Sequence, residues 1–551
     1  MDEKPELSAR TPLLSVAAHE RTPSRNISIN RIKEVTVQRY NVCTLSVFLI
    51  LATVFCEQFA FFSVLHNMVL FCTSKLDFTS FEATMTCWIF SGTVYMVTPL
   101  VGGYLADSLC GRYKTILGSG FIFVIGKILL FFSAGDFKSW SGYDREDVTK
   151  ALFLTSLVVI SIGSGGIQAN IIPFGAQHVS HMGPRAVQTF CHWYYWARNI
   201  GSIASAGVVY LQQGTKQFCW GYLMSLLILV VGLVIFRVGK RTYKHVPPSE
   251  SVLKKAITMC WKMRRRDRGQ FNMSQFETSN IYDVKNVLKS LPTYGFITVY
   301  WMSYAQMSTS LFLQSTELDL SIDGVNIPPA FLIYFNPAMV VLCIPLMDTI
   351  IYPLLIKCGK GPTYLQRIGI GMFLAVLALC YAGGLEIFRK QHEQFVQEST
   401  NISYNASSIS VFHQVPVFAL LGLSEVWTSI TGLEFAYTNF PDYMQGLITG
   451  LFLMTIGLGS VYSIILTAIV QRAKPEYSGL RWVIDIRAQN WYPNDPAANG
   501  HMEVLFFLIA GITFVFMLIF VFVTKFGYTS TQEDSRTQFV GSHNKLNSEN
   551  T

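Results

Sequence analysis

The chain alternates between long apolar runs and short polar stretches. About twelve of the runs contain about 20 or more mainly apolar residues, enough for a helix to cross the hydrocarbon core of a bilayer. Their approximate centres are Leu51, Val97, Val124, Val159, Ser202, Leu227, Met302, Val340, Leu374, Leu423, Met454 and Phe514. The pattern predicts an all-α membrane protein, because a backbone inside lipid must satisfy its own hydrogen bonds.

A long polar stretch separates the sixth run from the seventh. This stretch, residues 237–289, is rich in Lys and Arg, which concentrate in cytosolic loops. We therefore predict a cytosolic tail over 1–40, a six-helix half over 41–236 and the cytosolic linker. A second six-helix half over 290–526 and a cytosolic tail over 527–551 follow. An even number of spans places both termini in the cytosol.

Composition supports a membrane protein and excludes other classes. Of 551 residues, 51% are hydrophobic and 14% charged, against about 25% charged in soluble domains. The net charge of +8 lies mostly in loops, so it does not indicate nucleic-acid binding. Eleven cysteines fall mostly in apolar runs and do not form a disulfide framework. No metal-ligand spacing and no phosphate-binding loop occur, which argues against an enzyme and a metal cofactor.

The loop near 389–414 falls on the lumenal or extracellular side by the same count of spans. It holds two glycosylation sequons, at Asn401 and Asn405. Glycosylation requires that side of the membrane, so the sequons and the charge rule predict the same topology.

A polar turn stands between the second and third runs, within residues 102–115. Its spacing is GGxxADxxxGRxxT, with Asp107, Gly111 and Arg112 at the turn. Charge at a membrane edge can bridge helix ends, so Asp107, Gly111 and Arg112 are candidate gating residues, as is Asp348 in the similar turn described next. A basic loop that merely orients the protein is the other interpretation. A similar acid–glycine–basic turn begins at Asp348, at the equivalent place in the second half.

Several stretches together resemble one family. They are the turn over 102–115, GSGGI over 163–167, YYWARNIGS over 194–202, YAQMST over 304–309, IPPA over 327–330 and SEV…TGLEFAY over 424–437. The chain resembles the proton-dependent oligopeptide transporters, a branch of the major facilitator superfamily, and within them the peptide/histidine transporters of solute carrier family 15. The resemblance implies two six-helix halves with a substrate site between them near the bilayer midplane.

The resemblance also implies residues that bind substrate. Glu425 matches an acid that receives the peptide's amino terminus, and Asn170 and Asn336 match amides that contact its backbone. Tyr95 matches a pocket tyrosine, and Gln168 stands where the family has a lysine. Each could instead form hydrogen bonds between helices, which is common for polar residues in membranes.

The family's proton-coupling cluster, ExxER, is reduced here. Glu57 keeps the second acid, whereas Val54 replaces the first and Gln58 the arginine. Glu57 could retain a coupling role or simply be hydrogen-bonded in the bundle. Arg198 is a gained cation. It could face the pocket, where it would supply the cation that Glu57 lacks or bind a substrate carboxylate, or it could extend to the headgroups.

Two other polar residues receive structural interpretations. Glu434 is expected to brace its helix against an Arg or Lys near the cytosolic face. His66 stands alone in an apolar run and is expected to be packed and hydrogen-bonded.

The sequence therefore favours a secondary transporter of small peptides or amino-acid-like solutes, with protons as the coupling ion. An uncoupled facilitator of another organic solute and a non-transporting receptor or scaffold remain alternatives. Leu13-Leu14 is either a signal for sorting adaptors or a chance pair. The plasma membrane and the endolysosomal membrane are both compatible with the sequence.

Overall fold

The structure is a computed structural model that describes residues 44–135, 146–215, 217–245, 278–322, 325–351, 354, 362–399, 402–439, 445–472 and 501–548. The predicted 1–40 tail, most of the 237–289 linker, Leu13-Leu14 and Asn401 lie outside these ranges. Residues Val42–Thr551 form one compact unit.

Helices make up the first half of this unit. They are α2 (Leu45–Leu65), α3 (Met68–Lys75), α4 (Ser80–Gly92), η1 (Thr93–Val97), α5 (Thr98–Leu105), η2 (Ala106–Cys110), α6 (Arg112–Ala134), α8 (Glu146–Val179), η3 (Ser180–Met182), α9 (Pro184–Ala204), α10 (Ala206–Thr215), α11 (Phe218–Val238) and η4 (Gly239–Arg241).

The second half adds short strands to its helices. Its elements are α13 (Thr278–Tyr304), η7 (Ala305–Ser308), α14 (Ser310–Thr316), β1 (Leu318–Asp319), β2 (Ser321–Ile322), β3 (Val325–Asn326), η8 (Pro329–Tyr334), α15 (Phe335–Leu346), η9 (Met347–Ile351), α17 (Tyr364–Lys390), β4 (Gln394–Ser399), β5 (Ile402–Ser410), η10 (Val411–Gln414), α18 (Val415–Glu425), η11 (Val426–Ile430), α19 (Thr431–Asn439), α20 (Gln445–Arg472) and α21 (Met502–Ser548).

Ten helical segments of the described chain are long and apolar enough to cross a membrane. The runs centred on Ser202 and Met302 are also helical, as α9–α10 and α13, but are less apolar than the ten segments. Both carry polar side chains that lie inside the bundle, such as Asn199 and Ser303. The prediction of an all-α membrane protein is confirmed, and α21 continues through the segment predicted as the C-terminal tail.

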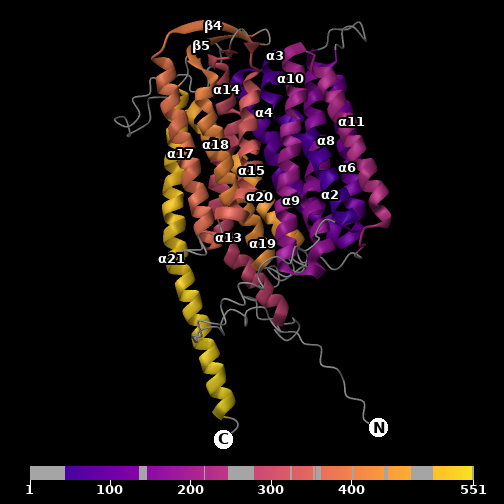
Figure 1. The fold of residues 1–551 in the computed structure, drawn as a ribbon, viewed down its shortest axis with the longest axis vertical. Coiled ribbons are helices and arrows are strands. Elements are labelled where there is room, and N and C mark those ends of the chain that lie inside the picture. Colours follow the sequence, from indigo (N-terminus) through magenta and orange to yellow (C-terminus); the bar gives the residue numbers. More distant parts are fainter. Residues whose placement is uncertain are drawn as a thin grey trace, which may run out of the picture. The chain divides into compact units, whose positions relative to one another are not determined.

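Each half packs mainly within itself (Figure 1). In the first half α6 lies against α8, and α2 lies against α9 and α11. In the second, α17 packs on α18 and α21, and α13 on α20. The halves meet where α20 contacts α4 and α5, and where α15 contacts α9.

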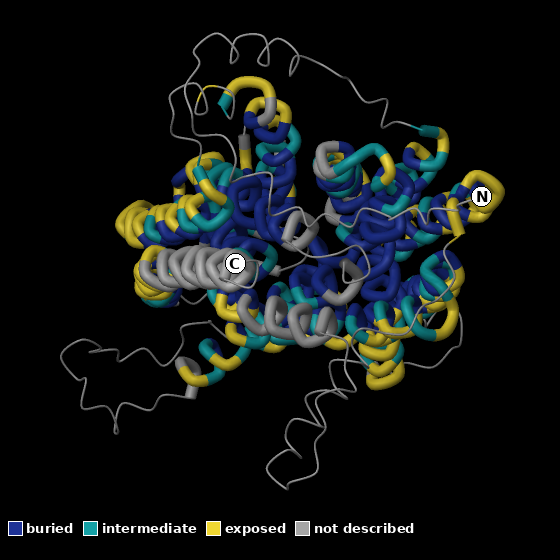
Figure 2. The backbone as a smooth tube through the Cα atoms, turned by 90° about the horizontal axis from the view of Figure 1, so that it is seen from below, coloured by how far each residue is buried: buried dark blue, intermediate teal, exposed yellow. Residues whose placement is uncertain are grey.

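Burial is arranged as expected for a protein surrounded by lipid. Figure 2 shows the buried positions in the middle of the bundle and the exposed positions around it. Many outward side chains are large and apolar, including Phe121 at 59% exposure, Leu227 at 56% and Phe522 at 62%. Apolar surface of this extent is stable against lipid tails and unfavourable against water.

A network of buried charges holds one end of the second half together. The Arg389 guanidinium lies 2.7 Å from a Glu317 carboxylate oxygen and 2.6 Å from one of Glu386. The Gln314 amide also donates to Glu386, at 2.9 Å. Because these residues lie on or beside α14 and α17, the network fastens the two helices to each other.

A small sheet is formed by β1, which follows α14, and by β4 and β5, which follow α17. Its strand order is β1-β5-β4, in which β1 pairs parallel to β5 and β4 pairs antiparallel to it. The predicted glycosylation site Asn405 lies in β5, opposite Val396.

We predict that glycosidase treatment lowers the apparent mass of the protein made in mammalian cells, because the two sequons of the hairpin loop would carry glycans. Electrophoresis before and after treatment measures the change. Replacing both Asn401 and Asn405 by Gln should remove the mass shift. Asn26 and Asn272 also stand in sequons, but these lie in the predicted cytosolic tail and linker, so replacing them should preserve the shift. A protein whose mass is unaffected by glycosidase would contradict the predicted topology.

Candidate functional site

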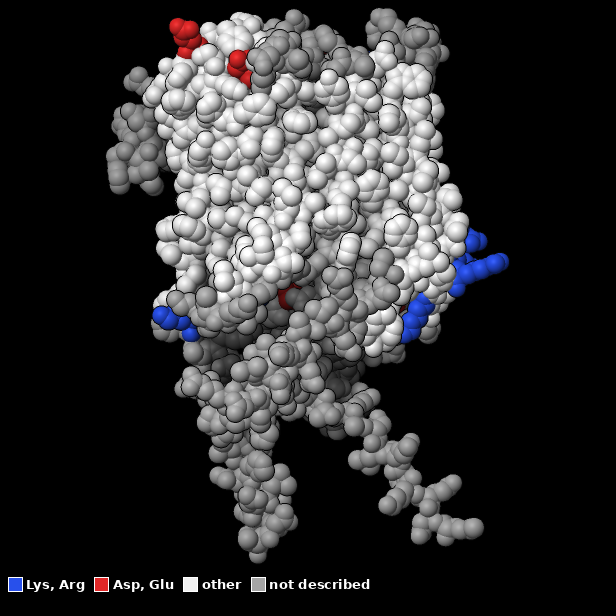
Figure 3. Space-filling view, in the orientation of Figure 1, with Lys and Arg blue, Asp and Glu red and all other residues white. Residues whose placement is uncertain are grey.

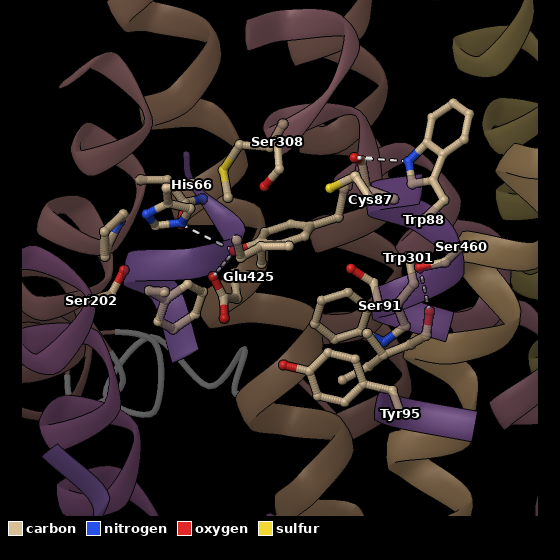
Figure 4. A pocket seen from close by; sticks show the side chains of 18 of the residues that line it. His66, Cys87, Trp88, Ser91, Tyr95, Ser202, Trp301, Ser308, Glu425 and Ser460 are labelled. Carbon is tan, nitrogen blue, oxygen red and sulfur yellow. Dashed lines mark hydrogen bonds between the residues drawn. The ribbon is translucent and has the colours of Figure 1, made fainter. Parts of the chain in front are cut away.

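A cavity lies between the two halves (Figure 4). Its volume, taken as the space open to the centres of water-sized spheres, is about 70 Å³. Both halves contribute to its wall, which consists of Phe62, Leu65, His66, Cys87, Trp88, Ser91, Tyr95, Arg198, Asn199, Ser202, Trp301, Tyr304, Ala305, Met307, Ser308, Asn336, Pro337, Glu425, Ile456 and Ser460. A cavity between the helices of a bundle is a usual place for a small-molecule site.

Arg198 brings a positive charge to the cavity from α9. Its Nη2 donates to the Tyr95 hydroxyl at 3.3 Å, and its Cζ lies 5.9 Å from the centroid of the Phe62 ring. Of the two predicted orientations, the structure therefore has the one that faces the pocket. No carboxylate in the described ranges forms an ion pair with Arg198, so its charge is available to a carboxylate of a ligand.

Glu425 brings a negative charge from the opposite half, at the end of α18. Only 4% of its surface is exposed, and its Oε2 accepts a hydrogen bond of 2.7 Å from Tyr304. The same hydroxyl lies 3.1 Å from Asn336 Oδ1. Among the residues with described positions, no cation is paired with Glu425. A buried carboxylate of this kind favours a cationic ligand group.

Aromatic rings form much of the remaining wall. In Figure 4, Trp88, Trp301 and Tyr95 lie to the right of Glu425, and His66 lies to its left with Ser202. The Trp88 indole donates to the Ala305 carbonyl at 3.4 Å, which orients that ring. The cavity therefore combines two opposite charges with apolar surface for an uncharged part of the solute.

Glu57 lies outside this cavity, in a network of neutral donors. Ser164 Oγ donates to Glu57 Oε1 at 2.8 Å, Gln168 Nε2 lies 3.5 Å from the same oxygen, and Gln58 Nε2 donates to Oε2. No Lys or Arg of the described chain forms an ion pair with Glu57. The amides of Gln58 and Gln168 thus occupy the places where the resemblance predicts cations.

Two of the predicted substrate residues do not line the cavity. Gln168 belongs to the Glu57 network, and Asn170 donates to the Gly166 carbonyl of its own helix at 2.9 Å. Gly102 lies so near to α8 that a Cβ there would come within 2.9 Å of Gly166 Cα. Asn170 therefore lies beside the tight contact of α5 and α8.

The polar turn between α5 and α6 forms a compact ionic link. Arg112 Nη2 lies 3.4 Å from Asp107 Oδ1, and Arg112 Nη1 donates to the Pro173 carbonyl of α8 at 3.4 Å. Gly111 has a φ of 79°, a conformation that favours glycine. In the second half, Asp348 is the second residue of η9, as Asp107 is of η2. Both turns have π-helical geometry, which supports the repeat predicted from the sequence.

Exchanging the two charges, Asp107→Arg with Arg112→Asp, is expected to lower uptake about tenfold, a typical magnitude for coupling between sites. The exchange preserves net charge and suits both helix ends, so the protein should still fold. The exchange also removes the hydrogen bond from Arg112 to the Pro173 carbonyl, which links the turn to α8. Initial uptake rates, normalised to protein in the membrane, provide the measurement, and unchanged kinetics would exclude a role in gating.

Other polar residues complete the comparison with the sequence. Glu434 pairs with Arg367 at 3.4 Å, which confirms the predicted brace.

Lys127 was not predicted from the sequence and is fully buried in α6. Its ammonium donates to the Ala60 carbonyl at 2.6 Å, to Ser225 Oγ at 2.9 Å and to Ser63 Oγ at 3.2 Å. A lone lysine in an apolar run was the available signal.

The prediction that His66 is hydrogen-bonded is wrong. The ring is 3% exposed and packs on Phe62 and Tyr334, at centroid distances of 4.8 and 5.1 Å. Neither ring nitrogen has a hydrogen-bond partner within the described ranges. The reason is local, since α2 ends at Leu65 and His66 caps it between two aromatic rings.

The sequence model of the POT family matches residues 113–279 and 262–483, more than half of the chain. The chain belongs to the POT family. Mouse solute carrier family 15 member 3 is 29% identical over 547 residues, which cover 88% of this chain and 91% of the relative. The probable peptide transporter ptr2 of Schizosaccharomyces pombe is 30% identical over 425 residues, covering 70% of this chain and 66% of the relative.

Among solved structures, an auto-inhibited POT family peptide transporter aligns with a TM-score of 0.68 at 19% identity, over 87% of this chain and 97% of the other. The major facilitator fold is thereby confirmed. The relatives and structural neighbours of this POT family member are transporters and not enzymes.

Proposed function

We propose that this POT family protein carries small zwitterions, either short peptides or amino-acid-like solutes, across a membrane by alternating access. The observation that carries the proposal is that Arg198 and Glu425 line one cavity from opposite halves of the molecule. The relatives named above as peptide transporters support the same substrate class.

The two charges match the two ends of such a solute. Glu425 would bind the amine, and the planar guanidinium of Arg198 would bind the carboxylate. A solute held at both ends bridges α9 and α18. Binding would therefore favour a state in which the halves are drawn together, which is the differential interaction that alternating access requires.

We propose Glu57 as the site of proton coupling. Three neutral side chains, those of Ser164, Gln58 and Gln168, lie around its carboxylate. Hydrogen bonds to the ionised form favour that form, so a movement of α8 that withdrew Ser164 and Gln168 would favour proton uptake. Asn170 and Gln168 then act through helix packing and this network, not through contact with the solute.

Uptake into proteoliposomes tests the proposal. The purified chain is supplied with a mixed panel of di- and tripeptides and histidine, with and without an inward proton gradient. Uptake that rises with the gradient supports proton-coupled transport. Uptake that does not change with the gradient would support the uncoupled facilitator. The absence, in the described chain, of a Lys or Arg paired with Glu57 favours that alternative. Binding without uptake would support the receptor or scaffold.

Glu57→Gln is expected to preserve peptide binding while uptake loses its response to the proton gradient, because the amide cannot titrate. Parallel measurements of ligand-induced thermal stabilisation and gradient-driven uptake separate the two effects. A Glu57→Gln protein that still responds to the gradient would assign coupling to another group.

The surface charges support the proposed topology. In Figure 3 the visible Lys and Arg side chains lie toward the lower end of the molecule, away from the end that bears β4 and β5. We propose that this positive end faces the cytosol.

A further inference from the structure

The charges of the cavity limit what kind of zwitterion it accepts. Arg198 and Glu425 are the only Arg, Lys, Asp or Glu side chains in its described wall. One amine and one carboxylate balance them. A further charge on the solute would have no counter-charge in a largely buried site, and such burial is unfavourable. The cavity therefore favours solutes whose side chains are uncharged.

Residues of the cavity wall also carry buried polar atoms that no group of the described chain satisfies. Asn336 Nδ2 and Trp301 Nε1 have no hydrogen-bond partner in the described chain. Both ring nitrogens of His66 also lack a partner there. Asparagine and tryptophan provide donors there, whereas a neutral imidazole provides one donor and one acceptor. His66 can therefore bind a hydroxyl or an amide, which contains both kinds of group.

The Phe62 ring links His66 to the predicted carboxylate site. His66 packs on it at 4.8 Å between centroids, and the Arg198 guanidinium lies 5.9 Å from the same ring. A carboxylate bound by Arg198 would thus place the neighbouring side chain of the solute near His66. That side chain belongs to the carboxyl-terminal residue of a peptide.

We propose that His66 determines specificity by hydrogen-bonding an uncharged polar side chain on the carboxyl-terminal residue of a net-neutral zwitterionic peptide. The inference rests on the proposed function, since it takes the termini to be held at Glu425 and Arg198. An apolar side chain at this place leaves both buried ring nitrogens without partners, which weakens binding.

Matched dipeptides test this inference on the purified full-length chain. Alanyl-tyrosine is expected to bind about tenfold or more tightly than alanyl-phenylalanine, and alanyl-asparagine than alanyl-leucine. Alanyl-lysine and alanyl-aspartate should bind more weakly than the neutral polar peptides. Thermal stabilisation as a function of peptide concentration gives the affinities, and competition for uptake in proteoliposomes checks them.

His66→Phe should bring both affinity ratios close to one, because it keeps the ring between Phe62 and Tyr334 and removes the nitrogens. His66→Asn should restore part of the discrimination, since its amide again provides a donor and an acceptor. Tyr334→Phe is the matched control. It keeps the ring edge against His66 and removes a hydroxyl that lies 3.2 Å from Ser205 Oγ outside the cavity wall, so the ratios should not change.

The outcomes distinguish a failure of the His66 role from a failure of the proposed transport function. Ratios that persist in His66→Phe, with binding still dependent on Glu425, would overturn the role of His66 and leave the proposed function intact. Equal binding of all neutral peptides by the unaltered protein would do the same. A chain that binds none of the dipeptides would overturn both.

Discussion

Glu425→Gln is expected to weaken peptide binding by about 30-fold or more, because the buried amine of the solute loses its only counter-charge. Gln has nearly the same shape and can still accept the hydrogen bond from Tyr304, so the unliganded protein should remain folded. Ligand-induced stabilisation depends on the ratio of ligand concentration to Kd, so at about 100 times the Kd of the unaltered protein it should fall to about a third or less.

Thermal unfolding with and without peptide measures this effect. Glu434→Gln is the matched control, because that acid lies further along the same span and pairs with Arg367 outside the cavity wall. It should keep the ligand-induced shift. If Glu425→Gln responds to peptide as the unaltered protein does, the amine site lies elsewhere and the proposed orientation of the solute is wrong.

Arg389→Leu is expected to reduce stability by about 3–5 kcal/mol, the usual result of breaking a buried ion pair by removing one partner. Arg389 has no exposed surface, and its loss removes the cation that Glu317 and Glu386 share, so that in the described chain only Lys390, 3.8 Å from Glu386, remains as a counter-charge. The unfolding temperature of the detergent-solubilised protein should fall, with earlier loss of the contact between α14 and α17.

Two further variants test whether the lost stability comes from the unpaired carboxylates or from the lost packing of the arginine. Combining Arg389→Leu with Glu317→Gln and Glu386→Gln should recover most of the lost stability, because neutral amides no longer need a buried cation. Arg237→Leu, which removes an exposed arginine from α11, should change the unfolding temperature little. A triple variant as unstable as Arg389→Leu alone would show that arginine packing, not charge, stabilises this end.

Much of the architecture could be predicted from the sequence because lipid imposes strong rules on it. Long apolar runs predicted the helices, and the acid–glycine–arginine turn predicted the link at Asp107 and Arg112. Glu425, Tyr95 and Asn336, selected through the family resemblance, line the cavity, and so does Arg198.

The rest depended on packing that one sequence does not reveal. Gln168 and Asn170 belong to a Gly-rich helix, and the close approach at Gly166 determines which of its faces meets α5. The position of His66 depends on where α2 ends, and helix ends are less certain than helix existence. Lys127 remained unnoticed because its partners are a carbonyl and two serines from other helices, with no acid to suggest a pair.

The sheet of β1, β5 and β4 consists entirely of second-half segments. β1 follows α14, and the hairpin of β4 and β5 joins α17 to the segment before α18. The hairpin should therefore tilt as one body with those helices during a transport cycle. A fluorophore attached to β4 would follow the tilt of that half at a distance from the cavity, so motion and ligand binding could be recorded separately in the same molecule.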